Sequence, residues 1–214
     1  MRILLPADFS RSPRQTIGAA IRIASERDAQ LVLVHAAESG DATADAEHAL
    51  AAAVQHAIGS GIRRVAAELV VGRPADEIAA IVADGFDLVV IERGNAGDAL
   101  VRIGACSVIA IHESADRPGR HVVCGTHGAV MLAAALRPDR ITLVGDSLDE
   151  LDQWAAPLYA TSSAAIAIQL DAAPGDGALR SRLAADLSID TIATGDAVLR
   201  EPLPVGCSIA IARP

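Results

Sequence analysis

Three residues that can bind metal, His121, Cys124 and His127, follow one another at intervals of three. Imidazole and thiolate groups at short spacing are typical ligands of zinc. The apolar residues between them predict a β-strand, in which alternate side chains point to opposite faces. His121 and His127 would then point one way and Cys124 the other. The spacing therefore does not predict a metal site.

A second candidate site, for an anion, follows directly after this apolar segment. Thr126, His127 and Gly128 follow it in sequence. A turn at this place can bind a small anion through its backbone N–H groups. We regard these three residues as a candidate anion-binding turn.

No catalytic constellation is visible in the sequence. The chain has no Ser-His-Asp order, no helix motif with paired carboxylates and no Cys-x-x-Cys. Cys106 and Cys207 each precede an apolar strand, which is typical of buried cysteines that act as small hydrophobic residues. We therefore expect a protein that is not an enzyme.

Composition excludes several classes of partner. The chain has 214 residues, a net charge of -9 and 2% aromatic residues. An acidic chain is a poor partner for nucleic acid, and so few rings leave no stacking platform for single strands. No apolar run approaches the roughly 20 residues that span a bilayer. The three cysteines are typical of reduced thiols, and Pro6 ends the first apolar run too early for a signal peptide, so we expect a cytoplasmic protein.

Apolar runs alternate with helical patterns over the first 115 residues. The runs predict strands at 3–5, 31–34, 68–71, 88–91 and 108–111, and the spacing of apolar residues predicts helices at 17–24, 45–58 and 75–84. Continuous apolar strands are typical of a parallel sheet that is covered on both faces. Alternating strands and helices then predict right-handed crossovers and an α/β fold.

Polar residues and glycines at the ends of these strands are candidate ligand contacts. His35 follows the strand at 31–34, at the edge where open α/β sheets bind ligands. Gly94 and Gly97 follow the strand at 88–91 and would allow the backbone to approach a ligand. An ordinary turn is the alternative interpretation of the two glycines.

The same pattern begins again after a short linker at 116–120. It predicts strands at 122–124, 141–144, 165–170, 191–193 and 209–211, and helices at 129–136, 148–161 and 178–187, the second of them interrupted near Pro157. The segment ACSVIAI at 105–111 also resembles GCSIAI at 206–211. We therefore predict two tandem, open, mostly parallel sheets flanked by helices, in domains 1–115 and 121–214, with a reduced second copy.

Five segments of the first half, in register over residues 1–112, resemble the universal stress protein family. They are LPADFS at 5–10, VLVH at 32–35, VGRPADEI at 71–78, DLVVI at 87–91 with GNAG at 94–97, and CSV at 106–108. The resemblance implies a Rossmann-like fold of the adenine nucleotide alpha hydrolase type. It also implies a cleft for ATP or AMP formed by Asp8, Val34, His35, Gly94 and Gly97. The alternative role of Asp8 is to end a strand and stabilise the next helix through its dipole.

The nucleotide loop departs from the family pattern. Nucleotide-binding members carry Gly-x2-Gly-x9-Gly-Ser/Thr, whereas Gly97 lies only nine positions before Cys106 and no Gly-Ser/Thr follows at the required place. The carboxylate of Glu92, just after the fourth strand, would repel a triphosphate. The loop is therefore interpreted as degenerate, and no cofactor is assigned beyond the ATP or AMP that the resemblance implies.

These observations predict a cytoplasmic stress-response or regulatory protein that acts through association. A protein that binds ATP or AMP in the first-half cleft is the alternative. The last strands, 107–111 and 208–212, are apolar and would leave exposed edges if each half stood alone. We expect them to pair within the chain as an internal pseudo-dimer, and a homodimer is the further association left open. Neither nucleic acid nor a membrane is an expected partner.

Overall fold

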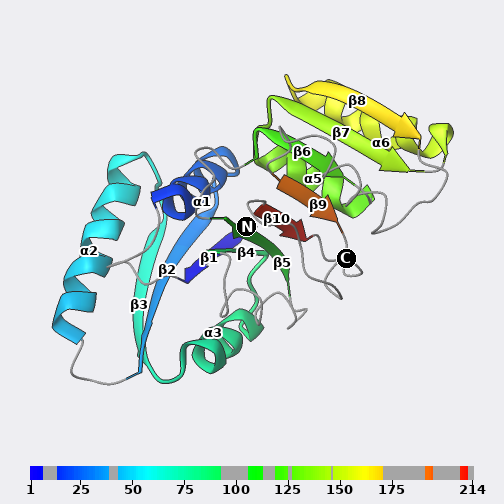
Figure 1. Ribbon diagram of the computed structural model, residues 1–214. Helices are drawn as coiled ribbons and strands as arrows, with labels where there is room; N and C mark the ends of the chain where they lie inside the picture. Colours follow the sequence, from blue (N-terminus) through cyan, green and yellow to red (C-terminus); the bar gives the residue numbers. More distant parts are fainter. Residues whose placement is uncertain are drawn as a thin grey trace. The chain divides into compact units, whose positions relative to one another are not determined.

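The apolar runs of the sequence form β-strands in the computed structural model of the protein (Figure 1). The structure describes residues 1–6, 14–38, 43–92, 106–112, 119–124, 127–145, 147–170, 191–194 and 208–211. The chain divides into two units, Met1–Glu113 and Ser114–Pro214, and the described residues of each unit form five strands.

The first unit alternates strands and helices along the chain. Its elements are β1 (Arg2–Pro6), α1 (Arg14–Glu26), β2 (Gln30–Ala37), α2 (Thr43–Gly59), β3 (Val65–Val71), α3 (Pro74–Ala83), β4 (Leu88–Glu92) and β5 (Ser107–Ile111). The strands lie in the order β3-β2-β1-β4-β5, and every neighbouring pair is parallel. The predicted α/β class with a parallel sheet flanked by helices is confirmed for this unit.

The central strand β1 is buried from Ile3 to Pro6. Ile3, Leu4 and Leu5 have no exposed surface, nor has Leu88 of β4, and Leu33 of β2 is only 1% exposed. Strands that are buried on both faces need helices above and below the sheet. Alanines such as Ala20 and Ala24 on the buried face of α1 let this helix lie close to the strands beneath it.

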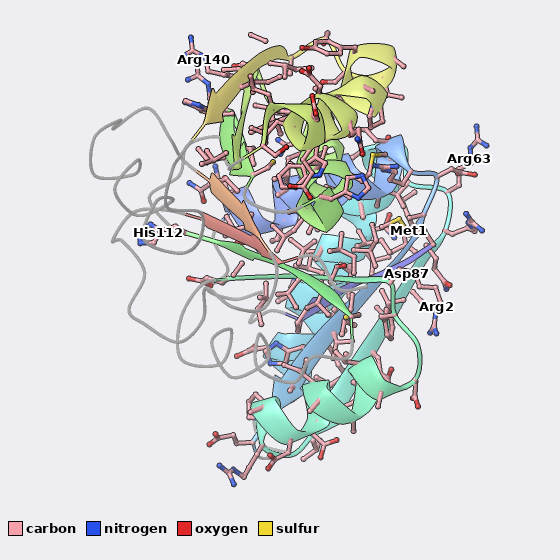
Figure 2. The ribbon with its side chains drawn as sticks, turned by 90° about the vertical axis from the view of Figure 1, so that its right-hand side faces the viewer. Met1, Arg2, Arg63, Asp87, His112 and Arg140 are labelled. Atoms are coloured by element: carbon pink, nitrogen blue, oxygen red, sulfur yellow. The ribbon has the colours of Figure 1, made fainter. Side chains whose placement is uncertain are left out.

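Hydrogen bonds and a cation–π contact join Arg2, at the start of β1, to the turn before β4. The backbone N–H of Arg2 donates to Oδ2 of Asp87 at 2.6 Å, and the N–H of Asp87 donates to the carbonyl of Arg2 at 3.0 Å. The Arg2 guanidinium lies 4.3 Å from the centre of the Phe86 ring and also donates to the carbonyls of Asp84 and Gly85. Met1, Arg2 and Asp87 thus lie together at the amino end of the sheet (Figure 2).

The second unit has the elements β6 (His121–Cys124), α5 (His127–Ala135), β7 (Arg140–Gly145), α6 (Leu148–Thr161), β8 (Ala165–Leu170), β9 (Thr191–Thr194) and β10 (Ser208–Ile211). Its strands lie in the order β10-β9-β6-β7-β8, again with parallel neighbours. Counted from the first strand of each unit, both sheets follow the order 3-2-1-4-5.

Helix α6 is not interrupted at Pro157, contrary to the prediction. It runs without a break from Leu148 to Thr161, with Pro157 inside it. The Ser147 side chain caps its start by accepting from the N–H of Glu150, and Leu151, Ala155 and Leu158 bury one face. This packing holds the helix together even though proline removes one internal hydrogen bond.

Several predicted boundaries differ from the structure by a few residues. Strand β2 extends to Ala37 and β3 begins at Val65, because parallel pairing joins residues 31–37 of β2 with 65–71 of β3. The expected helix at 178–187 and residues 116–118 of the expected linker lie outside the described residues. Within the described part of the chain, no helix is long and apolar enough to cross a membrane.

The burial of β1 predicts a large loss of stability for Leu4→Ala. Removing a fully buried leucine side chain from a packed core costs about 2–5 kcal/mol of unfolding free energy. Urea unfolding followed by circular dichroism measures the change. The matched control is Ile58→Ala in α2, where the side chain is 51% exposed and the expected change is within about 0.5 kcal/mol. Equal losses in the two variants would contradict the burial of β1.

Candidate functional site

The carboxyl edge of the first sheet is the natural ligand-binding edge of this fold. The chain proceeds from β1 to β2 and β3 on one side, and then returns to β4 and β5 on the other side of β1. In open α/β sheets, ligands bind beyond the carboxyl ends of the strands at such a reversal. The sequence places the predicted cleft residues at this edge.

Two of the five predicted cleft residues lie in the described structure. Val34 is fully buried and pairs with Pro6 of β1 and Glu68 of β3, so its backbone belongs to the sheet and its side chain to the core. His35 is half-buried and pairs with Leu69 of β3. Asp8, Gly94 and Gly97 lie outside the described residues.

Two further titratable side chains reach the same edge. Glu92 ends β4 and pairs with Ile111 of β5, and His112 follows directly. Both are half-buried. Figure 2 shows His112 at the end of the sheet opposite to Met1, Arg2 and Asp87. Sequence reasoning missed His112, although its position immediately after an apolar strand is the same signal that pointed to His35.

The predicted anion-binding turn lies partly in a helix. Helix α5 begins at His127, two residues earlier than expected, so His127 and Gly128 form its first turn, and Thr126 lies outside the described residues. Both helical residues are exposed. The His127 ring lies 6.3 Å from that of Trp154 in α6. The anion-binding role stays a prediction.

His121 and Cys124 belong to the core of the second unit. Strand β6 ends at Cys124, so the expected strand alternation does not extend to His127. His121 is 6% exposed, and its Nε2 lies 3.0 Å from Oγ1 of Thr142. Cys124 is fully buried, and this burial raises the pKa of its thiol. Among the described residues, no group of three His, Cys, Asp or Glu side chains is placed to hold a metal ion.

Comparison with known families decides the relationship of the first unit. The sequence profile of the Universal stress protein family matches residues 1–112, which is more than half of the chain. The chain belongs to the universal stress protein family. The match covers β1 to β5 and therefore the whole carboxyl edge described above.

A solved structure extends the likeness in fold to the second unit. The crystal structure of a protein from Pseudomonas aeruginosa, assigned to the universal stress proteins, superimposes with a TM-score of 0.64 at 15% identity. The similarity covers 100% of this chain and 93% of that one. At this identity the likeness concerns the fold alone. A comparison with curated proteins finds no match.

This universal stress protein should keep Cys124 unreactive while folded. A buried thiol with a raised pKa stays protonated, and only the thiolate attacks an alkylating reagent. We expect iodoacetamide at about pH 8 to modify Cys124 at least about 100-fold more slowly in the folded protein than in urea. Peptide mass spectrometry measures both rates, with the urea sample as the control. Equal rates in the two conditions would show that β6 is not buried.

Proposed function

We propose that this universal stress protein is a cytoplasmic stress-response or regulatory protein that acts through association, and that its first-unit loop does not hold ATP in the manner of nucleotide-binding family members. The observation that carries the proposal is the position of β5. Counting the family pattern from Gly94 and Gly97 places its last Gly-Ser/Thr at positions 107 and 108.

Positions 107 and 108 are already part of the sheet. Ser107 and Val108 begin β5 and pair with Leu88 and Val89, the first residues of β4. They therefore lie at the amino edge, whereas the ligand edge is at the carboxyl ends of the strands. A residue at position 107 or 108 therefore lies at the opposite end of the strands from a phosphate bound beyond the carboxyl end of β4.

The length of the connection supports the same conclusion. Fourteen residues join Glu92 of β4 to Ser107 of β5, and they must return from one edge of the sheet to the other because the two strands are parallel. The connection from β3 to β4 has sixteen residues and holds only the ten-residue helix α3. A parallel crossover needs a dozen or more residues. Little chain is left for a phosphate-binding loop.

We also propose that the second unit is a reduced tandem copy of the first, with domains at 1–115 and 121–214. Both sheets have the strand order 3-2-1-4-5. The turn between the first helix and the second strand contains a residue with positive φ in each unit, Asp28 at 44° and Arg137 at 48°. The similar segments at 105–111 and 206–211 lead into β5 and β10.

Association is proposed to involve the last strands. In each unit the fifth strand, β5 or β10, ends the strand order on one side. Both strands are uncharged, and an apolar strand at the end of a sheet is a template for pairing with another strand. Pairing within the chain gives an internal pseudo-dimer, and pairing between chains gives a homodimer.

The second candidate function is adenine-nucleotide binding in the first-unit cleft. The strand order favours it, because His35 and His112 lie at the carboxyl edge where the family places its ligand. A ligand with fewer phosphates, such as AMP, makes a smaller demand on the short loop. Asp8 is the residue proposed to contact adenine.

Calorimetric titration separates the two functions. With ATP we expect no saturable heat at concentrations up to about 1 mM, because the short loop and Glu92 disfavour a triphosphate. AMP is titrated in parallel, and Asp8→Ala is the control for any heat that appears. Saturable binding of AMP that Asp8→Ala abolishes would establish the alternative function. Saturable binding of ATP would overturn the proposed degeneracy.

Hydrogen exchange tests the pairing of the last strands. If β5 pairs with β10, Ile109→Pro in β5 should reduce the protection of the amides of residues 208–211 from exchange at least about tenfold. The reason is that proline has no N–H and removes a hydrogen bond between the strands. Ile109→Val keeps the N–H and is the matched control. Unchanged protection of residues 208–211 in Ile109→Pro, with β4 and β5 alone affected, would reject pairing within the chain.

Light scattering during size-exclusion chromatography distinguishes the further states. The mass of a single chain is 21.9 kDa. That mass would exclude the homodimer, and twice that mass would establish it. Repeating the measurement with Ile211→Pro and Ile211→Val shows whether the association depends on β10.

A further inference from the structure

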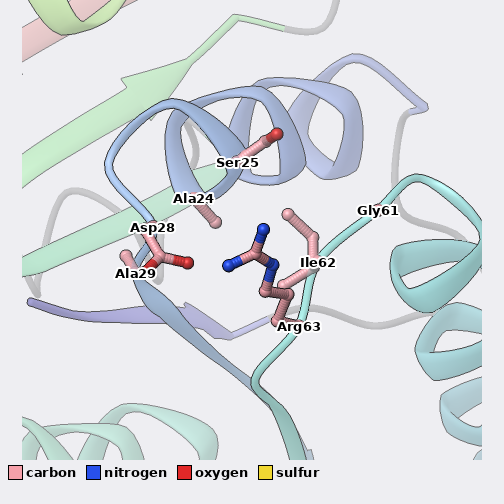
Figure 3. A pocket seen from close by; sticks show the side chains of 7 residues that line it. All are labelled: Ala24, Ser25, Asp28, Ala29, Gly61, Ile62 and Arg63. Carbon is pink, nitrogen blue, oxygen red and sulfur yellow. The ribbon is translucent and has the colours of Figure 1, made fainter.

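The pocket at the amino edge of the first sheet has few groups that could select a ligand. Its volume is about 360 Å³, and it lies between the turn that joins α1 to β2 and the turn that joins α2 to β3 (Figure 3). Arg63 and Asp28 face each other across it, but Asp28 also lies beside Arg64, with 3.8 Å between Oδ2 and a guanidinium nitrogen. The apolar residues of the lining are buried. An exposed guanidinium alone does not select a class of ligand.

The outer edge of the second sheet is a more specific surface. Strand β8 ends the strand order beside β7, and among the described residues no strand lies on its other side. Its outward N–H and C=O groups have no hydrogen-bond partner in the described part of the chain. The strand AIAIQL carries no charge and no proline, and its pairing with β7 continues without a bulge. Proteins use these features to protect an edge strand from pairing with another chain, and β8 lacks them.

The corresponding edge of the first sheet is protected. Strand β3 ends the order of that sheet and has an exposed charge at its centre, Glu68. A charge in the middle of an edge strand disfavours the addition of a further strand. Strand β8 occupies the same place in the order of the second sheet without such a charge. Strand addition is therefore disfavoured at β3 and allowed at β8.

One face of β8 is only partly covered by α6. Ile166 pairs with Ile141 of β7, so Ile166 and Ile168 lie on the same face of the sheet as Ile141. Gly145 of β7 also lies on this face, and a Cβ atom at Gly145 would be 3.1 Å from the Leu151 side chain of α6. Ile141 is fully buried beneath the helix, whereas Ile166 and Ile168 are half-buried. Helix α6 therefore leaves apolar surface exposed along β8.

Helix α6 adds two exposed apolar side chains beside this edge. Leu148 is 53% exposed and Tyr159 is 66% exposed. Successive residues of a helix are rotated by about 100°, so Leu148 and Tyr159 lie on one flank of α6 and Trp154 lies on the other. The Trp154 ring lies beside His127 of α5, which packs on β6 and β9. The flank with Leu148 and Tyr159 is therefore the one nearest the outer edge of β8.

We propose that β8 and this flank of α6 bind a second copy of the chain, with the two β8 strands antiparallel about a twofold axis. Antiparallel pairing extends the sheet and supplies partners for the outward N–H and C=O groups. The twofold axis places the two α6 helices on the same face of the sheet, running in opposite directions. Leu148, at the start of α6, then lies beside Tyr159 of the second copy, and this contact occurs twice. The inference goes beyond the proposed function, because it does not involve β5 or β10.

The charges around this edge also match a second copy. Arg140 begins β7 at the amino edge of the sheet, is exposed and has no ionic partner among the described residues. Asp149 and Glu150 lie in the first turn of α6, at the carboxyl edge. Antiparallel pairing brings the amino edge of one copy beside the carboxyl edge of the other, where arginine and carboxylates attract each other.

Light scattering during size-exclusion chromatography of the full chain tests the interface. At about 100 µM we expect twice the mass of the 21.9 kDa chain. Tyr159→Ser should raise the Kd of dimerisation at least about tenfold, because it removes an apolar contact that occurs twice. The matched control is Ile58→Ser in α2, where the side chain is 51% exposed, and it should leave the Kd unchanged. A wild-type chain with the mass of one copy would overturn the proposal.

A charge on the edge strand separates this interface from one through the last strands. Ala167 of β8 is exposed, so Ala167→Lys places a charge on the strand without burying it, and we expect this variant to be monomeric. Ala167→Ser is the uncharged control and should remain a dimer, and circular dichroism checks the fold of both variants. A dimer that survives Ala167→Lys but dissociates with Ile211→Pro is formed through the last strands and would overturn the proposal.

A double substitution tests the antiparallel arrangement of the two helices. Leu148→Ser and Tyr159→Ser remove the two sides of one contact, so the double variant should weaken dimerisation by less than the product of the two single effects. The Kd of each variant is measured by the same method over a dilution series. Independent effects that multiply fully would show that the two side chains do not meet, and would overturn the proposed arrangement.

Discussion

Parallel pairing of β1 on both sides is the constraint on which the first unit depends. Ile3, Leu4 and Leu5 are inaccessible to water, and β2 and β4 occupy both edges of the strand. Nothing polar can be accommodated along its length without a partner. Polar chemistry is therefore restricted to the two ends of the strands, where turns and helix termini meet solvent.

These two ends have different characters. At the carboxyl end, His35, Glu92 and His112 surround the edge at which this fold binds ligands. At the amino end, Arg2 and Asp87 fasten β1 to the segment before β4, and Arg63 and Asp28 face each other across a pocket. A site at one end can change without altering the other, because the apolar interior of the strands separates them.

The sequence was sufficient to predict the strands but not all of their limits. Continuous apolar runs such as 31–34 and 88–91 are strands because burial on both faces selects such residues. The extension of β2 through His35 to Ala37 depends on its pairing with β3, which no local pattern reveals. Helix α6 continues through Pro157 because its buried leucines pack on the sheet, so tertiary contacts outweigh a local helix breaker.

The candidate sites were less predictable for the same reason. The apolar run at 31–34 predicts both the burial of Val34 and the position of His35 at its end, but the pairing of Val34 with Pro6 and Glu68 depends on both neighbouring strands. The sequence predicts a turn at His127. In the structure His127 begins α5, and its ring lies near that of Trp154 in α6, a residue 27 positions later in the chain. The pocket with Arg63 and Asp28 lies between two turns that are distant in sequence. Neither turn carries a sequence motif that predicts a pocket.

The Arg2–Asp87 contact has a consequence for the order of folding. A single crossover connection separates β1 from its partner β2 in the sequence. By contrast, 85 positions separate Arg2 of β1 from Asp87, which precedes β4. Long-range pairing of this kind slows folding because a large loop must close first. During synthesis, β1, β2 and β3 can assemble early, while the other edge of β1 stays unpaired until residues 88–92 are available. Until then that apolar edge is exposed to aggregation, so the folding chain is most vulnerable before β4 has joined the sheet.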